Sequence, residues 1–159
     1  MKPRLFALAL ACHFAASAFA AGGDLMVLEA WIRTAPPNAP LAGYMTLENR
    51  SGKERQLVAA TSPDFGRVTV HRTEHAAGMT AMKQLAALSI PAHGRLVLQP
   101  GADHLMLEEP KQALQAGRRV PVALRFADGS AMTVRFEVRD ASAGAHDHHR
   151  AAGVHEAPP

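Results

Sequence analysis

Residues 119–139 read RVPVALRFADGSAMTVRFEVR, and this stretch is the clearest indication of the fold class. Two segments, Arg119–Phe126 and Ala131–Arg139, alternate apolar with polar or small residues, which is the period of a β-strand with one buried face. Asp128-Gly129 lies between them and is typical of the type I′ turn of a tight hairpin. The stretch therefore predicts two antiparallel strands joined by a short turn.

Segments of the same kind occur on the N-terminal side of this pair, separated by turn residues at the spacing of about 8–12 residues that sandwiches and barrels show. They are Met26–Arg33, Gly43–Asn49, Arg55–Thr61, Arg67–His71, Ala81–Leu85, Arg95–Gln99 and His104–Leu107. The one candidate helix is Glu109–Leu114. We therefore expect an all-β fold, an antiparallel β-sandwich or Greek-key barrel that forms a single domain over residues 21–140.

The first twenty residues are typical of an export signal that is cleaved. Lys2 and Arg4 precede an almost wholly apolar run, and Ala18-Phe19-Ala20 is a small-residue cleavage site, which places the mature start at Ala21. The apolar run is too short for a membrane span. We expect a mature protein that lies in the periplasm and does not span the membrane.

Cys12 is the only cysteine of the chain and lies within this signal. It leaves lipoprotein processing open as an alternative, although Ala9-Leu10-Ala11 before it matches the usual context poorly. Once the signal is removed, the chain has no disulfide, no thiol nucleophile and no thiolate for a blue-copper electron-transfer site.

Charge and motifs argue against several other classes of function. Of 17 Lys and Arg residues two leave with the signal, which gives 15 against 14 Asp and Glu, without the basic patch that nucleic-acid binding requires. No Gly-rich phosphate loop, Gly-x-Ser-x-Gly or His-Glu-x-x-His motif is present. We do not expect an enzyme or a nucleic-acid partner.

Two histidines and two methionines form a spaced set: His71, ten residues, Met82, twenty-one residues, and then His104-Leu105-Met106. Imidazole and thioether are soft, neutral donors that favour Cu(I). Methionine never has to lose a proton to bind, and histidine competes with protons only near its ordinary pKa of about 6.5. The set predicts a Cu(I) site.

Strand alternation predicts how three of these side chains point. In residues 67–71 the valines share one face and His71 the other, and in residues 104–107 the leucines share one face and His104 and Met106 the other. If the aliphatic faces form the core, the three candidate ligands point away from it. We therefore expect them near the surface, where metal can be exchanged.

A histidine-rich end follows the domain. Ala141–Pro159 lacks any apolar period and is predicted to be a disordered tail. It carries His146, His148, His149 and His155, and such tracts bind Cu(II) and other divalent metals. The alternative is a tail that only increases solubility.

With these residues the chain resembles the periplasmic copper chaperones called PCu(A)C, whose signature is His, ten residues, Met, twenty-one residues and His-x-Met. Both spacings are met by the four residues named above, and Ala30–Arg33, Gly43–Leu47, Ile90–Gly94 and Pro100–Asp103 agree as well. The resemblance implies a cupredoxin-like β-sandwich that binds Cu(I) through these side chains. It further implies delivery of copper to the CuA centre of a haem–copper oxidase, cytochrome c oxidase, beside a Sco-type thiol protein. For the tail it suggests a second site of Cu(II) type. We expect a monomer.

The segment between the first two ligands departs from the family pattern, because His75 and Met79 are additional donors there. Met79 can be a secondary ligand or a substitute for Met82, and the alternative is that both are ordinary loop residues. Two other functions remain open: copper sequestration or tolerance without a delivery partner, and an adhesive or assembly β-sandwich whose histidines are incidental.

Overall fold

The computed structural model describes residues 23–36, 39–76 and 78–141. The strands are β1 (Leu25–Arg33), β2 (Leu41–Asn49), β3 (Arg55–Thr61), β4 (Phe65–Ala76), β5 (Met79–Leu85), β6 (Leu88–Ile90), β7 (Arg95–Leu98), β8 (Asp103–Pro110), β9 (Arg119–Phe126) and β10 (Ala131–Arg139). The predicted signal peptide and residues 142–159 of the predicted tail, with all four of its histidines, lie outside the described residues.

The described residues contain no α-helix, so the prediction of a helix at Glu109–Leu114 is wrong. β8 continues to Pro110, and the residues after it form bends and irregular chain. Within the described part of the chain no helix is present that could cross a bilayer.

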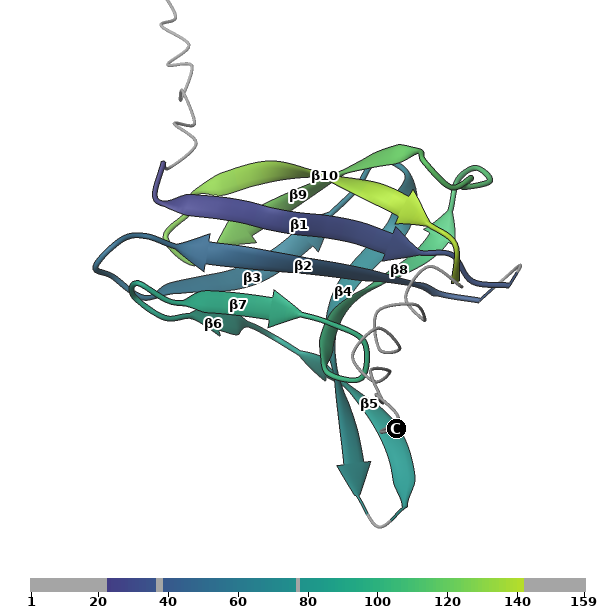
Figure 1. Ribbon diagram of the computed structural model, residues 1–159, viewed down its shortest axis with the longest axis horizontal. Helices are drawn as coiled ribbons and strands as arrows, with labels where there is room; N and C mark the ends of the chain where they lie inside the picture. The colour runs from purple at the N-terminus through teal and green to yellow at the C-terminus, as the bar shows by residue number, and fades with distance from the viewer. Residues whose placement is uncertain (1–22, 37–38, 77, 142–159) are drawn as a thin grey trace, which may run out of the picture.

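All ten strands belong to one hydrogen-bonded sheet in the order β5-β4-β8-β2-β1-β10-β9-β3-β6, with β7 paired to β2. The sheet folds back on itself, so that β1 and β2 lie in front of β3 and β9 and form the two layers of a sandwich (Figure 1). The predicted all-β sandwich is confirmed, with one difference. β1 and β10 pair in parallel, because β10 turns back from β9 and reaches β1 running in the same direction.

The core lies between the two layers and follows the alternation expected from the sequence. From β9 and β10 it takes Val120, Val122, Leu124, Phe126, Val134, Phe136 and Val138, all of them buried. Ile32, Leu47, Leu105 and Leu107 join them from β1, β2 and β8. The apolar faces of these strands therefore fix which side chains remain on the outer face of the sheet.

The turn between β9 and β10 is not the predicted type I′ turn. Only Gly129 has a positive φ, 83°, whereas type I′ also requires one at the residue before it. The Gly129 amide donates to the Phe126 carbonyl at 3.0 Å, which gives a type I turn followed by a left-handed glycine. Asp128 favours this form because its Oδ1 accepts bonds from the Ser130 amide and hydroxyl.

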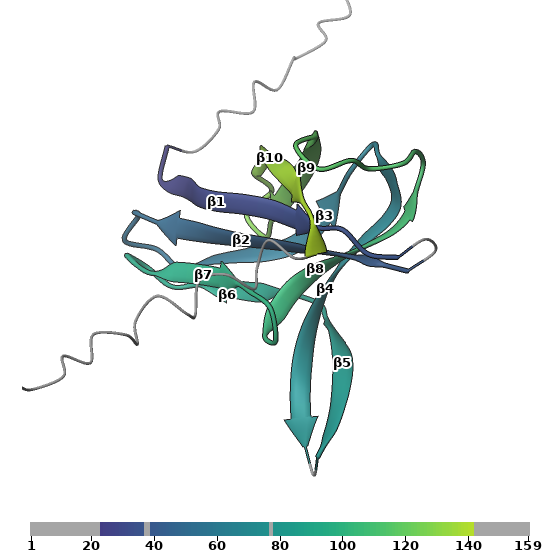
Figure 2. The same cartoon turned by 45° about the vertical axis from the view of Figure 1, so that its right-hand side comes forward.

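β4 is longer than predicted and leaves the sandwich. It pairs with β8 as far as Arg72, which lies opposite Asp103, and continues to Ala76 paired only with β5. We call residues 73–76 with residues 78–84 the arm. Figures 1 and 2 show it extending away from the two layers.

Candidate metal centre

Three of the four candidate ligands lie together on the β4–β8 ladder. His71 is directly opposite His104, and Thr69 is directly opposite Met106. Residues opposite each other in an antiparallel pair point to the same face, and diagonal neighbours lie about 7–8 Å apart. The rings of His71 and His104 have centroids 6.1 Å apart and are inclined by 33°. Met106 is diagonal to His71, so pairing of two distant segments brings these three side chains together.

Met82 reaches the same face from β5. His71 is opposite Gln84 and Thr73 is opposite Met82, so Met82 is a second diagonal neighbour of His71. Its side chain is 61% exposed. All four candidate ligands therefore share one face of the sheet, with His71 adjacent to each of the others.

The predicted orientation relative to the core agrees with the structure, but the predicted surface position does not hold for His104. Leu105 and Leu107 are fully buried on the core face, and His104 and Met106 are on the opposite face. His104 is nevertheless only 6% exposed. The His71 ring lies beside it, and the preceding turn brings the Ala102 carbonyl to its Nδ1 at 3.0 Å.

Hydrogen bonds leave one ring nitrogen of each histidine available to a metal. At His104, Nδ1 donates to the Ala102 carbonyl, so Nε2 carries the free lone pair. At His71, Nε2 lies 3.0 Å from the Thr69 hydroxyl, whereas Nδ1 is buried and has no hydrogen-bond partner. A buried nitrogen without a partner costs about 1–3 kcal/mol. A bound metal ion would satisfy it.

The surroundings of His71 favour its neutral form. Burial lowers the pKa of the His71 imidazole below its ordinary 6.5, and the neighbouring His104 lowers it further, against an opposing effect of Glu108. A neutral ring is the form that binds a metal. His71 is therefore ready to bind near neutral pH.

Nearby carboxylates are occupied by arginines. Arg67 forms two bonds to Glu108, at 2.7 and 2.9 Å, and Arg72 forms two to Asp103 at the same distances. Among the residues that the structure describes, no three His, Cys, Asp or Glu side chains gather closely enough to hold a metal. A metal at the His71–His104 pair would therefore depend on the methionine sulfurs.

The two additional donors of the segment lie on opposite faces. His75 is opposite Thr80 on the same face as His71 and Met82, and its Nδ1 lies 3.1 Å from the Thr80 hydroxyl. Met79 is opposite Ala76, one residue out of phase, and is 71% exposed. The pleat therefore favours Met82 over Met79 as a partner of His71.

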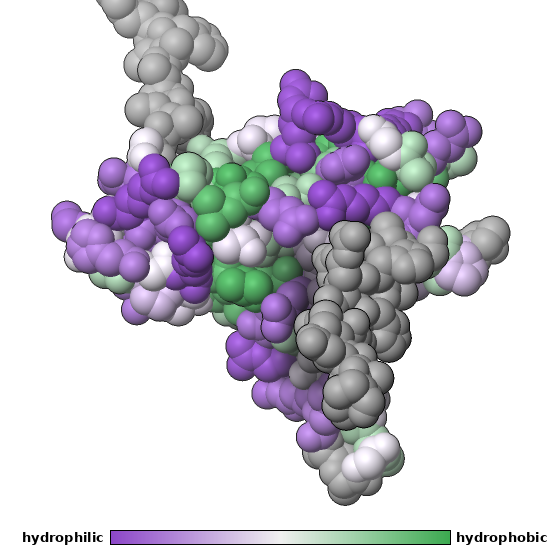
Figure 3. Space-filling model, in the orientation of Figure 1, coloured by the Kyte–Doolittle hydropathy of each residue, from purple (hydrophilic) through white to green (hydrophobic). Residues whose placement is uncertain are grey.

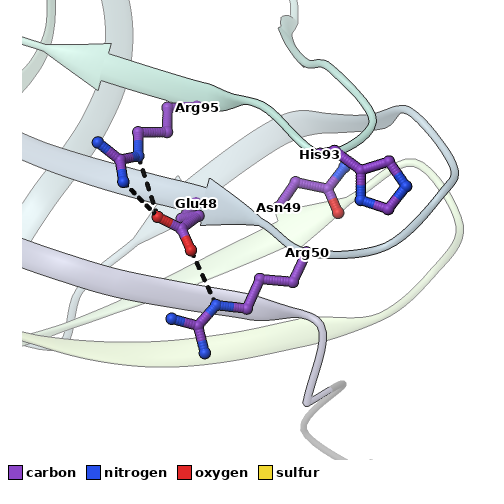
Figure 4. A pocket seen from close by; sticks show the side chains of 5 residues that line it. All are labelled: Glu48, Asn49, Arg50, His93 and Arg95. Carbon is purple, nitrogen blue, oxygen red and sulfur yellow. Dashed lines mark hydrogen bonds and ion pairs between the residues drawn. The ribbon is translucent and has the colours of Figure 1, made fainter.

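A surface hollow of about 630 Å³ lies elsewhere, at the end of β2 (Figure 4). It is lined by Glu48, Asn49, Arg50, His93 and Arg95. Arg50 and Arg95 each pair with Glu48 at 2.8 Å. Glu48 is six residues along β2 from Ala42, the residue opposite Met106, which is about 20 Å. The hollow offers no sulfur donor and does not coincide with the candidate centre.

Comparisons with known proteins identify the family of the chain. The family model described as "Putative lipoprotein LpqE-like" matches residues 25–138. A protein of Leifsonia xyli subsp. xyli, named as a lipoprotein, is 33% identical over 144 residues, covering 88% of this chain and 86% of that protein.

Several solved structures have a fold similar to that of this chain. The apo form of DR1885 from Deinococcus radiodurans is 33% identical with a TM-score of 0.59, covering 88% of this chain and 95% of that one. The Cu(I) form of DR1885 is 37% identical with a TM-score of 0.58, and the match covers 70% of this chain and 75% of that one. The copper-bound PCuAC domain of PmoF2 has a similar fold, with a TM-score of 0.61. It is 21% identical, and the match covers 74% of this chain and 94% of that one.

Proposed function

The chain belongs to the LpqE-like family, the family of PCuAC domains, and from this membership we propose that it binds Cu(I) and passes it to a partner protein. The observation that carries the proposal is the shared face of His71, Met82, His104 and Met106, which presents two imidazoles and two thioethers to one region. Soft neutral donors of this kind select Cu(I). Copper is here the cargo of the protein.

The mechanism that these residues support is ligand exchange. The His104 ring is held by the Ala102 carbonyl, which leaves Nε2 as the metal-binding nitrogen, and the His71 ring, with its unpartnered Nδ1, has its centroid 6.1 Å from the His104 ring. Met82 is largely exposed, so an incoming thiolate can approach copper from the side of this residue and displace the protein ligands one at a time. Four protein ligands leave no coordination position for a substrate, and we propose no catalytic activity.

The recipient that we propose is the CuA centre of a haem–copper oxidase, with a Sco-type thiol protein at the same step. The alternative is sequestration of copper without a dedicated recipient. Deletion of the gene separates the two. Loss of oxidase activity at low copper supports delivery, whereas sensitivity only to high copper supports sequestration.

We propose that residues 1–20 direct export to the periplasm and that the tail, through His146, His148, His149 and His155, captures Cu(II). Because relatives are described as lipoproteins, the mature N-terminus needs a direct test. Mass spectrometry of the exported protein distinguishes a chain that starts at Ala21 from one that starts at a lipidated Cys12.

The copper site is tested by anaerobic titration with Cu(I) against a chelator. We expect the full chain, with its tail histidines replaced by alanine, to bind one Cu(I), and X-ray absorption to count two sulfur and two nitrogen ligands. Replacing His71, Met82, His104 and Met106 together should abolish this binding, while His93→Ala, far from the centre, should not. Equal affinity in the fourfold variant would refute the site. Absence of one-to-one binding in the parent would favour the adhesive alternative.

A further inference from the structure

Met82 occupies a position between two histidines of β4. It lies opposite Thr73, so His71, two residues before, and His75, two residues after, are both its diagonal neighbours. Each diagonal corresponds to about 7–8 Å. Met82 is therefore placed to share a metal with either imidazole.

The His75 ring is oriented in the same way as that of His104, through a hydrogen bond at Nδ1. Its Nδ1 lies 3.1 Å from the hydroxyl of Thr80, directly opposite, and with Nδ1 donating this bond Nε2 keeps a free lone pair. His75 is exposed, and so is Met82. One imidazole and one thioether on the same face form a pair of soft donors that Cu(I) accepts.

His75 is too far out to belong to the inner set. It lies four residues beyond His71 along β4, about 13 Å. The arm that carries it extends from the sandwich (Figure 2), and its surface is mostly hydrophilic with less polar residues near the far end (Figure 3). Exposure falls along this face, from Met82 at 61% to His104 at 6%.

We propose that His75 and Met82 form an outer Cu(I) site on the arm, through which copper enters and leaves the inner site. The proposal rests on the proposed function, because it takes His71, His104 and Met106 as the final ligands. On entry, the bond from copper to His75 Nε2 breaks, a bond to His71 forms, and the bond to the Met82 sulfur is kept. Copper stays Cu(I) throughout, and release is the reverse.

The test is stopped-flow transfer of Cu(I) between the protein, with its tail histidines replaced by alanine, and the chelator bathocuproine disulfonate. We expect His75→Ala to slow both uptake and release at least about tenfold, and to lower the equilibrium affinity far less than His71→Ala does. Met79→Ala is the matched control, because Met79 is also exposed on the same arm but faces the other way. It should leave both rates within about twofold.

A second measurement isolates the outer pair. In the His71→Ala, His104→Ala background we expect weak binding of one Cu(I) with one nitrogen and one sulfur ligand by X-ray absorption, lost when His75→Ala is added. Unchanged transfer rates in His75→Ala, or an affinity loss equal to that of His71→Ala, would overturn the outer site. A parent protein that takes up no Cu(I) contradicts the proposed function instead.

Discussion

At the scale of single residues, the pleat of β5 separates Met82, which fits the spacing of the ligand set, from Met79, which the sequence left open as a secondary or substitute ligand. Met82 is in phase with His71, whereas Met79 is out of phase and points to the other side. Both are exposed, so neither substitution should disturb the fold.

We expect Met82→Ala to weaken Cu(I) binding at least about tenfold, which corresponds to about 1.4 kcal/mol. Met79→Ala should change it by less than about threefold. Competition with a Cu(I) chelator measures both variants under the same conditions. If Met79→Ala weakened Cu(I) binding more than Met82→Ala, the pairing register of β4 and β5 would differ in the copper-bound protein.

Asn49 is a residue whose role is structural. It is fully buried, and its side-chain amide donates to the carbonyls of Lys53, Ile90 and Pro91, while its Oδ1 accepts two bonds from Ser51. It thus joins the turn after β2 to the turn before β7. Removing one partner from a buried network leaves the others unsatisfied.

We expect Asn49→Ala to lower the free energy of unfolding of the copper-free protein by about 3 kcal/mol. Urea denaturation followed by Trp31 fluorescence measures this as a shift in the midpoint. Lys53→Ala is the control, because Lys53 contributes only its backbone carbonyl to Asn49. A similar loss in both variants would contradict the role given to the Asn49 side chain.

At the scale of elements, the β9–β10 hairpin carries a pH-dependent contribution. The pKa of Asp128 is lowered below its ordinary value, mainly by the bonds from Ser130 and also by Arg55. The pKa of Asp128 is thus lower in the folded protein than in the unfolded chain, where it is about 3.9. The carboxylate therefore stabilises the folded protein at pH values above about 3.9, and this stabilisation is lost as the pH falls through the pKa of the folded state.

We therefore expect Asp128→Asn to be less stable than the parent at pH 7, by no more than about 1 kcal/mol because the group is largely exposed. The difference should shrink below pH 4. Thermal unfolding of both proteins between pH 3 and pH 7 gives the comparison. A difference independent of pH would mean that the charge of Asp128 is not its cause.

The arm is largely exposed and is joined to the rest of the sheet only at its base. Six of the seven residues of β5 are exposed, and beyond Thr73 the arm is paired only to itself. Segments with few buried contacts open locally at low cost. We expect its amides to exchange with solvent at least about tenfold faster than those of β9 and β10, and Cu(I) to slow this exchange, as measured by hydrogen–deuterium exchange. Equal protection of arm and sandwich would contradict this.

The elements also show what the sequence could predict. Arg55–Thr61, Arg119–Phe126 and Ala131–Arg139 are confirmed with their bounds. The last two alternate clearly over their whole length, whereas Arg55–Thr61 contains a β-bulge between Leu57 and Ala59. The outer part of β4 was missed because Arg72, Thr73, Glu74 and His75 are polar and give this segment no apolar face. β6 was missed because Leu88–Ile90 is too short to show a period.

At the scale of the whole molecule, the candidate centre depends on the pairing of distant segments. The alternation within residues 67–71 and 104–107 predicted that the ligands share an orientation. The opposition of His71 to His104 is a property of sheet order, which no local pattern contains. The burial of His104 likewise depends on a tertiary neighbour, His71, that sequence spacing does not identify.

Because pairing of β4 with β8 assembles the centre, the unfolded chain cannot bring His71 beside His104, and Cu(I) should bind almost only the folded state. A ligand at about 100 times its Kd then adds about 2.7 kcal/mol to the free energy of unfolding. We expect this increment in the protein with its tail histidines replaced, and equally in its Asn49→Ala form, because Asn49 lies at the far end of β2. At the same Cu(I) concentration the increment should be much smaller in the His71→Ala, His104→Ala variant, whose remaining binding is weak. Anaerobic thermal unfolding with and without Cu(I) measures it, and an equal increment in the double variant would mean that copper stabilises the fold from somewhere other than this face.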